Sequence, residues 1–384
     1  MNTLNLVRGD AHLSTKYKCV VMMLLLCFSF FSFSAYAQTD GNAFVVPNTK
    51  VHKIQSNIVS NQIYEVRIAL PGSYASSPNQ KYPIVVVLDG QWNFTNVADI
   101  IGKLAYDGRM PEAITVAITW GGEGDNPDLL RWRDFLRPTM PEFPMSGGAS
   151  LFLDALTQEL IPFVENHYRV ADKKVLVGAS LGGLFTSYAM VEKPGYFDGH
   201  IAVAGAYWVD GEYLDGKLAA MKRTKALSGV RSFLATGTYD GNQAHVSTFN
   251  ERVKDAHLKE FKNKFKSFSD LGHAGVEPSA YTYGLQYIFE RPFLKLSEEF
   301  LAGYAGNYEG GFPGGPIFPL SVAVAGKGLL AVTDAAGTYE FQAESEISFY
   351  MKGANIVATF QPNGDFILNN QGNILTFSPV STQP

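Results

Sequence analysis

Ser180 stands in the pentapeptide Gly178-Ala-Ser-Leu-Gly182, which has the G-x-S-x-G spacing of a serine nucleophile. An apolar run at residues 174–178 precedes the serine, and a helix-like segment rich in small residues follows it. Glycines two positions before and after let the backbone turn sharply, so the hydroxyl can stand at the tip of a strand-to-helix turn. A tight turn without chemistry is the alternative. The flanking strand and helix favour a catalytic serine.

A serine nucleophile needs a histidine base, and in this setting the order along the chain is serine, acid, histidine. His273 lies in the glycine-flanked loop SDLGHAGVEP after the run FKSFSD, and this position predicts it as the base. The other downstream histidines fit less well. His200 opens an apolar strand, and His257 lies on a charged amphipathic segment. His245 closely follows Asp240, which is the candidate acid.

The acid that orients the base is predicted to be Asp240. It lies in FLATGTYDGN, where an apolar strand runs into a turn between the serine and the histidine. An aspartate that caps its own turn is the alternative reading. Asp255 and Glu260 are the rival acids.

Acyl transfer also needs donors directed at the oxyanion that develops on the substrate. The backbone N–H of Leu181 is one candidate, and that of Gln91, in the loop after the run VVVLDG, is the other. Three aromatic residues near these loops are predicted to wall a substrate pocket, with a place in the core as the alternative. They are Trp92, Tyr207 and Trp208.

The elements that must position these groups alternate between strands and helices from about residue 51 to 293. Apolar or alternating runs predict strands at residues 63–70 (an antiparallel edge strand), 84–90, 113–120, 174–178, 199–205 and 231–237. Helical periodicity is clearest at residues 149–165, where Pro162 is expected to bend the helix. The pattern predicts an α/β fold, with a mostly parallel sheet, helices on both faces and a site beyond the carboxyl ends of the strands.

The composition changes near residue 296, where glycine and proline become frequent and short alternating runs follow. Turn signals separate these runs, including Pro362-Asn363-Gly364. We therefore predict a hydrolase domain at residues 38–297 and a small antiparallel β-barrel or sandwich at residues 298–384.

The N-terminus has the pattern of a signal peptide at residues 1–37, with Lys16 and Lys18, an apolar run and the small-x-small site Ala35-Tyr36-Ala37. An uncleaved membrane anchor is the alternative, but the run is short for a spanning helix. Cleavage would remove Cys19 and Cys27, the two cysteines of the chain. The expected location is the periplasm or the medium.

Composition sets further limits. Hydrophobic residues make up 46% of the 384 and charged residues 17%, as in a globular protein, and the net charge of −5 gives no basic surface for nucleic acid. No pattern calls for a metal or another cofactor. The expected partner is a small-molecule or carbohydrate-linked ester, and the oligomeric state is left open.

With these residues in hand, the chain resembles the "Putative esterase" branch of the α/β-hydrolase superfamily, which includes esterase D-like enzymes, feruloyl esterases, trilactone siderophore esterases and mycolyltransferases. The likeness runs from about residue 63 to 293 and rests on YPIVVVLDGQWNF, RDFLRPT, VLVGASLGGLFTSYAM and GHAGVEPSAYTYGL. It implies a triad of Ser180, Asp240 and His273. One departure, AGAYWV in place of the branch's serine-proline-serine and paired tryptophans, concerns the substrate pocket.

These observations predict an exported serine esterase that works through an acyl-enzyme. Transfer of the acyl group to an alcohol and hydrolysis of a trilactone siderophore are alternatives on the same triad. A non-catalytic binding protein on an esterase scaffold is the third alternative.

Overall fold

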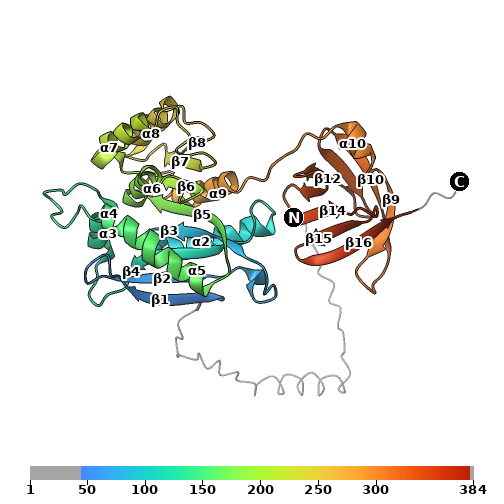
Figure 1. Ribbon diagram of the computed structural model, residues 1–384, viewed down its shortest axis with the longest axis horizontal. Helices are drawn as coiled ribbons and strands as arrows, with labels where there is room; N and C mark the ends of the chain where they lie inside the picture. Colours follow the sequence, from blue (N-terminus) through green and yellow to red (C-terminus); the bar gives the residue numbers. More distant parts are fainter. Residues whose placement is uncertain (1–44, 381–384) are drawn as a thin grey trace, which may run out of the picture. The chain divides into compact units, whose positions relative to one another are not determined.

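The computed structural model describes residues 45–380, so the predicted signal peptide lies outside the described residues. Its first sheet has eight strands: β1 Thr49–Gln55, β2 Ile63–Ala69, β3 Tyr82–Val87, β4 Ile114–Trp120, β5 Val170–Ala179, β6 Gly199–Val203, β7 Arg231–Gly237 and β8 Lys262–Phe268. They lie in the order β1-β2-β4-β3-β5-β6-β7-β8 (Figure 1). Strands β3 to β8 are parallel, whereas β1 and β2 run antiparallel to their neighbours. The predicted mostly parallel sheet is confirmed.

Helices cover both faces of this sheet. They are the 3-10 turn η1 Gly72–Tyr74, α2 Gly90–Tyr106, α3 Pro127–Phe135, α4 Ala149–Ala155, the π-helical turn η2 Leu156–Leu160, α5 Ile161–His167, α6 Leu181–Glu192, α7 Tyr207–Ala220, α8 Gln243–Asp255 and α9 Glu277–Ile288. Alternate residues of the buried strands supply two separate cores, as a sheet covered on both sides requires. Helices α2 and α9 contribute to one core, and α3 to α8 contribute to the other.

Two local expectations differ from the structure. Strand β2 is antiparallel as expected, but it is not at the edge, because β1 pairs along its outer side. Residues 51–55 of strand β1 alternate between exposed and half-buried, but none of the strand is fully buried and its apolar residues, Val51 and Ile54, are three positions apart, so its sequence carries little strand signal. In the helical segment expected at residues 149–165, the π turn η2 interrupts the helix directly before Pro162, which cannot donate a backbone hydrogen bond.

The C-terminal strands form a closed antiparallel barrel, which is one of the two forms predicted for this region. The elements are α10 Glu298–Ala302 and β9 Gly306–Gly311, β10 Phe318–Gly326, β11 Leu329–Thr333, β12 Thr338–Ala343, β13 Ser348–Met351, β14 Ile356–Phe360, β15 Phe366–Asn370 and β16 Asn373–Pro379. Closure comes from β16 pairing with β9, for example Phe377 opposite Gly310. A closed barrel leaves no unpaired sheet edge. The predicted hairpin turn at Pro362-Asn363-Gly364 joins β14 to β15.

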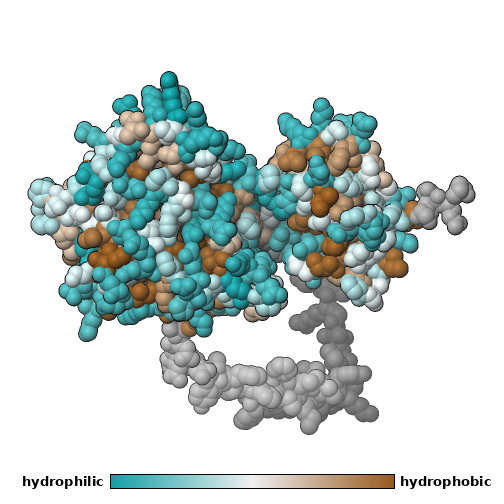
Figure 2. Space-filling model, in the orientation of Figure 1, coloured by the Kyte–Doolittle hydropathy of each residue, from teal (hydrophilic) through white to brown (hydrophobic). Residues whose placement is uncertain are grey.

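On the face shown in Figure 2, hydrophobic residues form small separate groups on a mostly hydrophilic surface. Within residues 45–380, no helix combines the length and the apolar character needed to cross a bilayer.

Candidate active site

Ser180 occupies a sharp turn between the end of β5 and the start of α6. Its backbone dihedrals are φ 58° and ψ −117°, a conformation that a residue with a side chain rarely adopts. Three hydrogen bonds hold the turn, because the Ser180 N–H donates to Val203 O and the Ser180 carbonyl accepts from the N–H groups of Leu184 and Ala206. A strained serine at this position is typical of a nucleophile held for attack.

The glycines of the pattern are needed for steric reasons. A Cβ at Gly178 would lie 2.4 Å from the carbonyl oxygen of Gly182, so the strand end and the first turn of α6 could not approach this closely. At Gly182 the nearest atom would be Asp89 Oδ2 at 3.3 Å, a tight contact. Gly183, which the sequence pattern did not single out, is also constrained, because its Cβ would meet Val203 O at 2.8 Å.

His273 and Asp240 are brought together by the loops after β8 and β7. His273 Nδ1 lies 2.9 Å from Asp240 Oδ1. A carboxylate can only accept, so Nδ1 carries the proton and Nε2 has its lone pair free. The Asp240 side chain is fully buried and also accepts hydrogen bonds from the Thr236 hydroxyl at 2.9 Å and the Asn242 N–H at 3.0 Å. These donors fix the carboxylate, which in turn fixes the imidazole.

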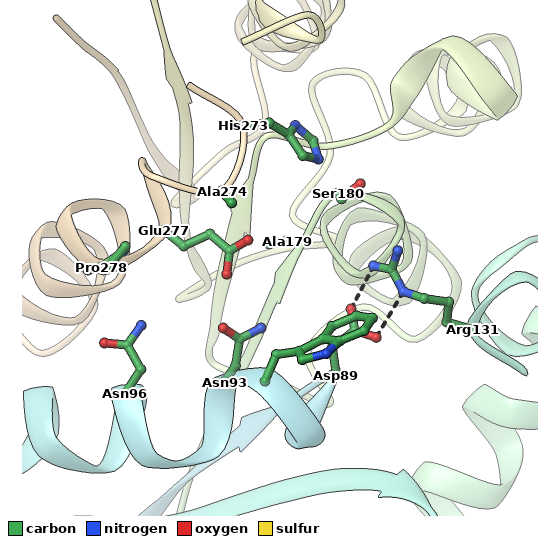
Figure 3. A pocket seen from close by; sticks show the side chains of 11 residues that line it. Asp89, Asn93, Asn96, Arg131, Ala179, Ser180, His273, Ala274, Glu277 and Pro278 are labelled. Carbon is green, nitrogen blue, oxygen red and sulfur yellow. Dashed lines mark hydrogen bonds and ion pairs between the residues drawn. The ribbon is translucent and has the colours of Figure 1, made fainter. Parts of the chain in front are cut away.

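Ser180 and His273 line the same cavity, which has a volume of about 400 Å³. Figure 3 shows the imidazole of His273 turned toward the Ser180 side chain. The Ser180 hydroxyl makes no hydrogen bond with any residue in the range 45–380. Hydrogen bonds of this kind are often long without substrate and tighten when it binds. The other lining residues are Asp89, Trp92, Asn93, Asn96, Arg131, Ala179, Ala274, Glu277 and Pro278.

An ion pair that was not expected from the sequence lies in this cavity. Arg131 donates from Nε to Asp89 Oδ1 at 3.0 Å and from Nη2 to Asp89 Oδ2 at 2.8 Å (Figure 3). Burial raises the pKa of Asp89, and the Arg131 guanidinium opposes this shift. Asp89 also has a left-handed backbone, φ 53° and ψ 47°, directly before α2. Burial, charge pairing and backbone strain beside the candidate nucleophile make Asp89 a candidate residue of the functional site.

Glu277 and Asn93, which also line the cavity, were not predicted from the sequence. Glu277 is the first residue of α9, four positions after His273, and the buried Tyr281 hydroxyl donates to its Oε2 at 3.1 Å. Burial raises the pKa of the Glu277 carboxyl. The helical spacing from Glu277 to Tyr281 was visible in the sequence. The burial of its carboxyl was not, because burial depends on α2 packing against α9.

The two predicted oxyanion donors lie at the starts of helices. Leu181 is the first residue of α6, and Gln91 is the second residue of α2. The first N–H groups of a helix have no partner within the helix, so both are free to bind an anion. The Gln91 side chain accepts a hydrogen bond from the Thr119 hydroxyl at 2.8 Å.

The predicted aromatic wall is only partly at the cavity. Trp92 lines it, is 53% exposed and has the Arg131 guanidinium 5.4 Å from its ring centroid. Tyr207 is buried, stacks on Phe249 and shares a hydrogen bond with Ser187 at 2.8 Å, so its position gives no support to a role in binding substrate. Trp208 is 51% exposed and does not line the cavity.

The rival histidines and acids lie elsewhere. His200 is fully buried, and burial lowers its pKa to about 4. His245 and His257 are exposed on and after α8. Asp255 ends α8, and Glu260 pairs with Lys225 at the surface.

The fold and the strained serine turn define the chain as an α/β-hydrolase. More narrowly, residues 56–271 match the model of the family described as "Putative esterase", and this is more than half of the chain. The protein therefore belongs to this family of carboxylic ester hydrolases.

Relatives agree with this assignment. The chain is 29% identical to the ferri-bacillibactin esterase BesA of Bacillus subtilis over 280 residues, which are 64% of this chain and 91% of BesA. The crystal structure of the BES protein from Bacillus cereus superposes with a TM-score of 0.57 at 22% identity, covering 64% of this chain and 97% of that one. The structure of an IroE-like serine hydrolase from Shewanella oneidensis gives a TM-score of 0.56 at 22% identity, covering 66% and 84%. At these identities the two structures show a shared fold.

Proposed function

We propose that the protein hydrolyses carboxylic esters through an acyl-enzyme on Ser180. The observation that carries this proposal is the geometry of one cavity, in which Ser180 faces His273 and His273 is hydrogen-bonded to the buried Asp240 at 2.9 Å. Family membership supports ester hydrolysis as the overall reaction. The roles of the individual residues are part of the proposal.

In the first half-reaction, His273 Nε2 takes the proton of the Ser180 hydroxyl while Oγ attacks the ester carbonyl carbon. The N–H groups of Leu181 and Gln91 hold the negative charge that moves to the carbonyl oxygen. Asp240 keeps the imidazole oriented and stabilises its protonated form. When the tetrahedral intermediate collapses, the carbon–oxygen bond to the alcohol breaks, and His273 gives the alcohol its proton.

In the second half-reaction, water replaces the alcohol. His273 takes a proton from water, the hydroxide attacks the acyl-enzyme, and Ser180 leaves as the free hydroxyl with the proton returned by His273. Another alcohol in place of water would give acyl transfer. Product analysis with a competing alcohol separates the two outcomes, and hydrolysis predicts free acid as the main product.

A fluorophosphonate probe tests the nucleophile. It should label the purified protein at Ser180, and Ser180→Ala should abolish both labelling and ester turnover. Equal labelling of the two proteins would contradict the proposal, and so would labelling at Ser180 of a protein that, before labelling, turns over no ester. The second result would instead favour a binding protein on an esterase scaffold.

Among substrates, a trilactone siderophore is the candidate favoured by the likeness to BesA. Trp92, with the Arg131 guanidinium 5.4 Å from its ring centroid, offers an aromatic surface in the cavity for an aromatic group of such a substrate. Incubation with bacillibactin, with and without iron, followed by chromatography, should show conversion of the trilactone to linear products. No conversion alongside rapid hydrolysis of simple esters would exclude this substrate.

We also propose that the protein is exported after cleavage behind Ala37. The support is the charged, apolar and small-residue pattern of residues 1–37. Cell fractionation and N-terminal sequencing should find mature protein outside the inner membrane, beginning at Gln38. A cytoplasmic protein with its leader intact would contradict this.

A further inference from the structure

One wall of the active-site cavity is built from polar side chains that the proposed triad does not use. Asn93 and Asn96 come from the first turns of α2, and Glu277 comes from the first turn of α9. All three line the cavity that contains Ser180. Figure 3 shows Glu277 and Asn93 reaching into this space from the two helices.

Asn93 is almost completely buried, with 5% of its surface exposed. Its carboxamide nevertheless makes no hydrogen bond with any residue among 45–380. Its nitrogen and oxygen are not among the enclosed, unpaired side-chain atoms of the described residues, which are Gln91 Nε2 and His200 Nε2, so the carboxamide is open to the cavity that Asn93 lines. Polar groups in protein interiors are nearly always hydrogen-bonded, and the partner of this one must come from within the cavity, as water or a ligand. The carboxamide therefore indicates a place for a polar ligand group.

The Glu277 carboxyl is anchored on one side and free on the other. Its Oε2 accepts from Tyr281, whereas its Oε1 has no hydrogen-bond partner in the described part of the chain. The positive charge nearby, on Arg131, is already paired with Asp89. The free oxygen of Glu277 is not enclosed by protein and is thus an acceptor open to the cavity, and burial of the carboxyl raises its pKa. A hydrogen-bond donor on a ligand would satisfy it.

We propose that Glu277 and Asn93 form a polar subsite that binds a hydrogen-bond donor, a hydroxyl or an ammonium group, carried by the ester substrate. The proposal rests on the proposed esterase function. It makes these two residues determinants of specificity. The enzyme then prefers esters that carry such a donor near the scissile bond over alkyl esters of the same size.

Pairs of substrates with equal shape test this. On the acyl side, p-nitrophenyl 3-hydroxybutyrate is compared with the 3-methylbutyrate, and the β-alanyl ester with the butyrate. On the alcohol side, 2-hydroxypropyl acetate is compared with isobutyl acetate. We expect kcat/KM for the donor-bearing ester to be higher by about tenfold or more in at least one pair, because a site built to hydrogen-bond rejects analogues that lack the group.

Variants then assign the preference to the subsite. Glu277→Met and Asn93→Leu should bring the ratio of kcat/KM in that pair close to one, whereas Glu290→Met, a matched change at an exposed glutamate, should leave it unchanged. The ratio does not depend on the fraction of protein that is folded. Glu277→Gln should keep a preference for hydroxyl and lose one for ammonium.

Two results would overturn the proposal: equal kcat/KM within every pair for the unaltered protein, or a preference that survives Glu277→Met and Asn93→Leu. A role of Glu277 limited to starting α9 gives the second result. Failure of the esterase function is recognised separately, because no ester would then be turned over and the fluorophosphonate probe would not label Ser180.

Discussion

Arg131 holds both carboxylate oxygens of Asp89 directly beside the turn that carries Ser180. The Arg131 side chain is 15% exposed and that of Asp89 is 3% exposed, so this is a buried pair. The closest atom to a Cβ built on Gly182 would be Asp89 Oδ2. The pair therefore connects α3, the end of β3 and the serine turn, which lie far apart in the sequence.

Breaking this pair should destabilise the fold strongly. Arg131→Met leaves a buried carboxylate without its partner, and such changes cost about 3–5 kcal/mol. Urea unfolding measures the loss, and Asp89→Asn combined with Arg131→Met should recover part of it. Arg137→Met is the control, because Arg137 pairs with Asp210 at a more exposed position and its loss should cost about 1 kcal/mol or less. Equal losses for the two single variants would contradict this prediction.

Replacing Asp240 with asparagine should slow catalysis without unfolding the protein. Asp240→Asn keeps the size of the side chain but removes the charge beside His273, which in the proposed mechanism orients and stabilises the protonated imidazole. In a comparable serine triad, this change lowers kcat by about 10⁴. Steady-state kinetics with a p-nitrophenyl ester measure the effect. Asp255→Asn, at the exposed end of α8, should keep full activity, and the reverse pattern would identify Asp255 as the acid.

The fold was predictable because its signals are local. Short apolar runs of the parallel strands and the G-x-S-x-G turn can be read within ten residues. Ser180, Asp240 and His273 were proposed because each follows a strand-like run in the sequence. Their catalytic roles remain predictions. Strand β1 was not found, since its apolar residues, Val51 and Ile54, do not alternate with polar ones.

The rest of the cavity depends on tertiary contacts. Asp89 and Arg131 are 42 residues apart, and nothing in either segment shows that they pair. Trp92 and Tyr207 both looked like candidates for the wall. They differ in burial, which is set by the packing of Tyr207 on Phe249. Aromatic type alone could not separate them.

Two glycine substitutions should have opposite effects. Gly178→Ala places a methyl group 2.4 Å from Gly182 O, so either α6 must shift or the serine turn must distort. We expect a loss of about 1–3 kcal/mol by analogy with overpacked cores, together with loss of esterase activity. Gly102→Ala lies within α2 with no atom near the new methyl group and should stabilise the protein by about 0.5–1 kcal/mol. Thermal unfolding and ester turnover measure both, and a fully active, stable Gly178→Ala would contradict the steric argument.

The Glu277 carboxyl should lower the free energy of unfolding as the pH rises above the ordinary pKa of a glutamate. Burial raises the pKa of its carboxyl in the folded state above the ordinary value of a glutamate, so the folded protein binds this proton more tightly than the unfolded chain does. In the interval between these two pKa values the folded state holds more protons, and the free energy of unfolding decreases with rising pH. Glu277→Gln removes this titration and can still accept from Tyr281.

The difference in unfolding free energy between Glu277→Gln and the unaltered protein should therefore shift in favour of the variant from pH 4 to pH 8. Urea unfolding at the two pH values measures it. Asp89, whose pKa burial also raises, is present in both proteins, so only its repulsion with Glu277 enters the difference, and this repulsion raises the pKa of Glu277 in the same direction as burial does. The exposed Glu290→Gln should show no such trend. The prediction is contradicted if this difference in unfolding free energy stays constant from pH 4 to pH 8, or if Glu277→Gln becomes less stable relative to the unaltered protein. Either result would show that burial does not disfavour the ionised carboxylate of Glu277.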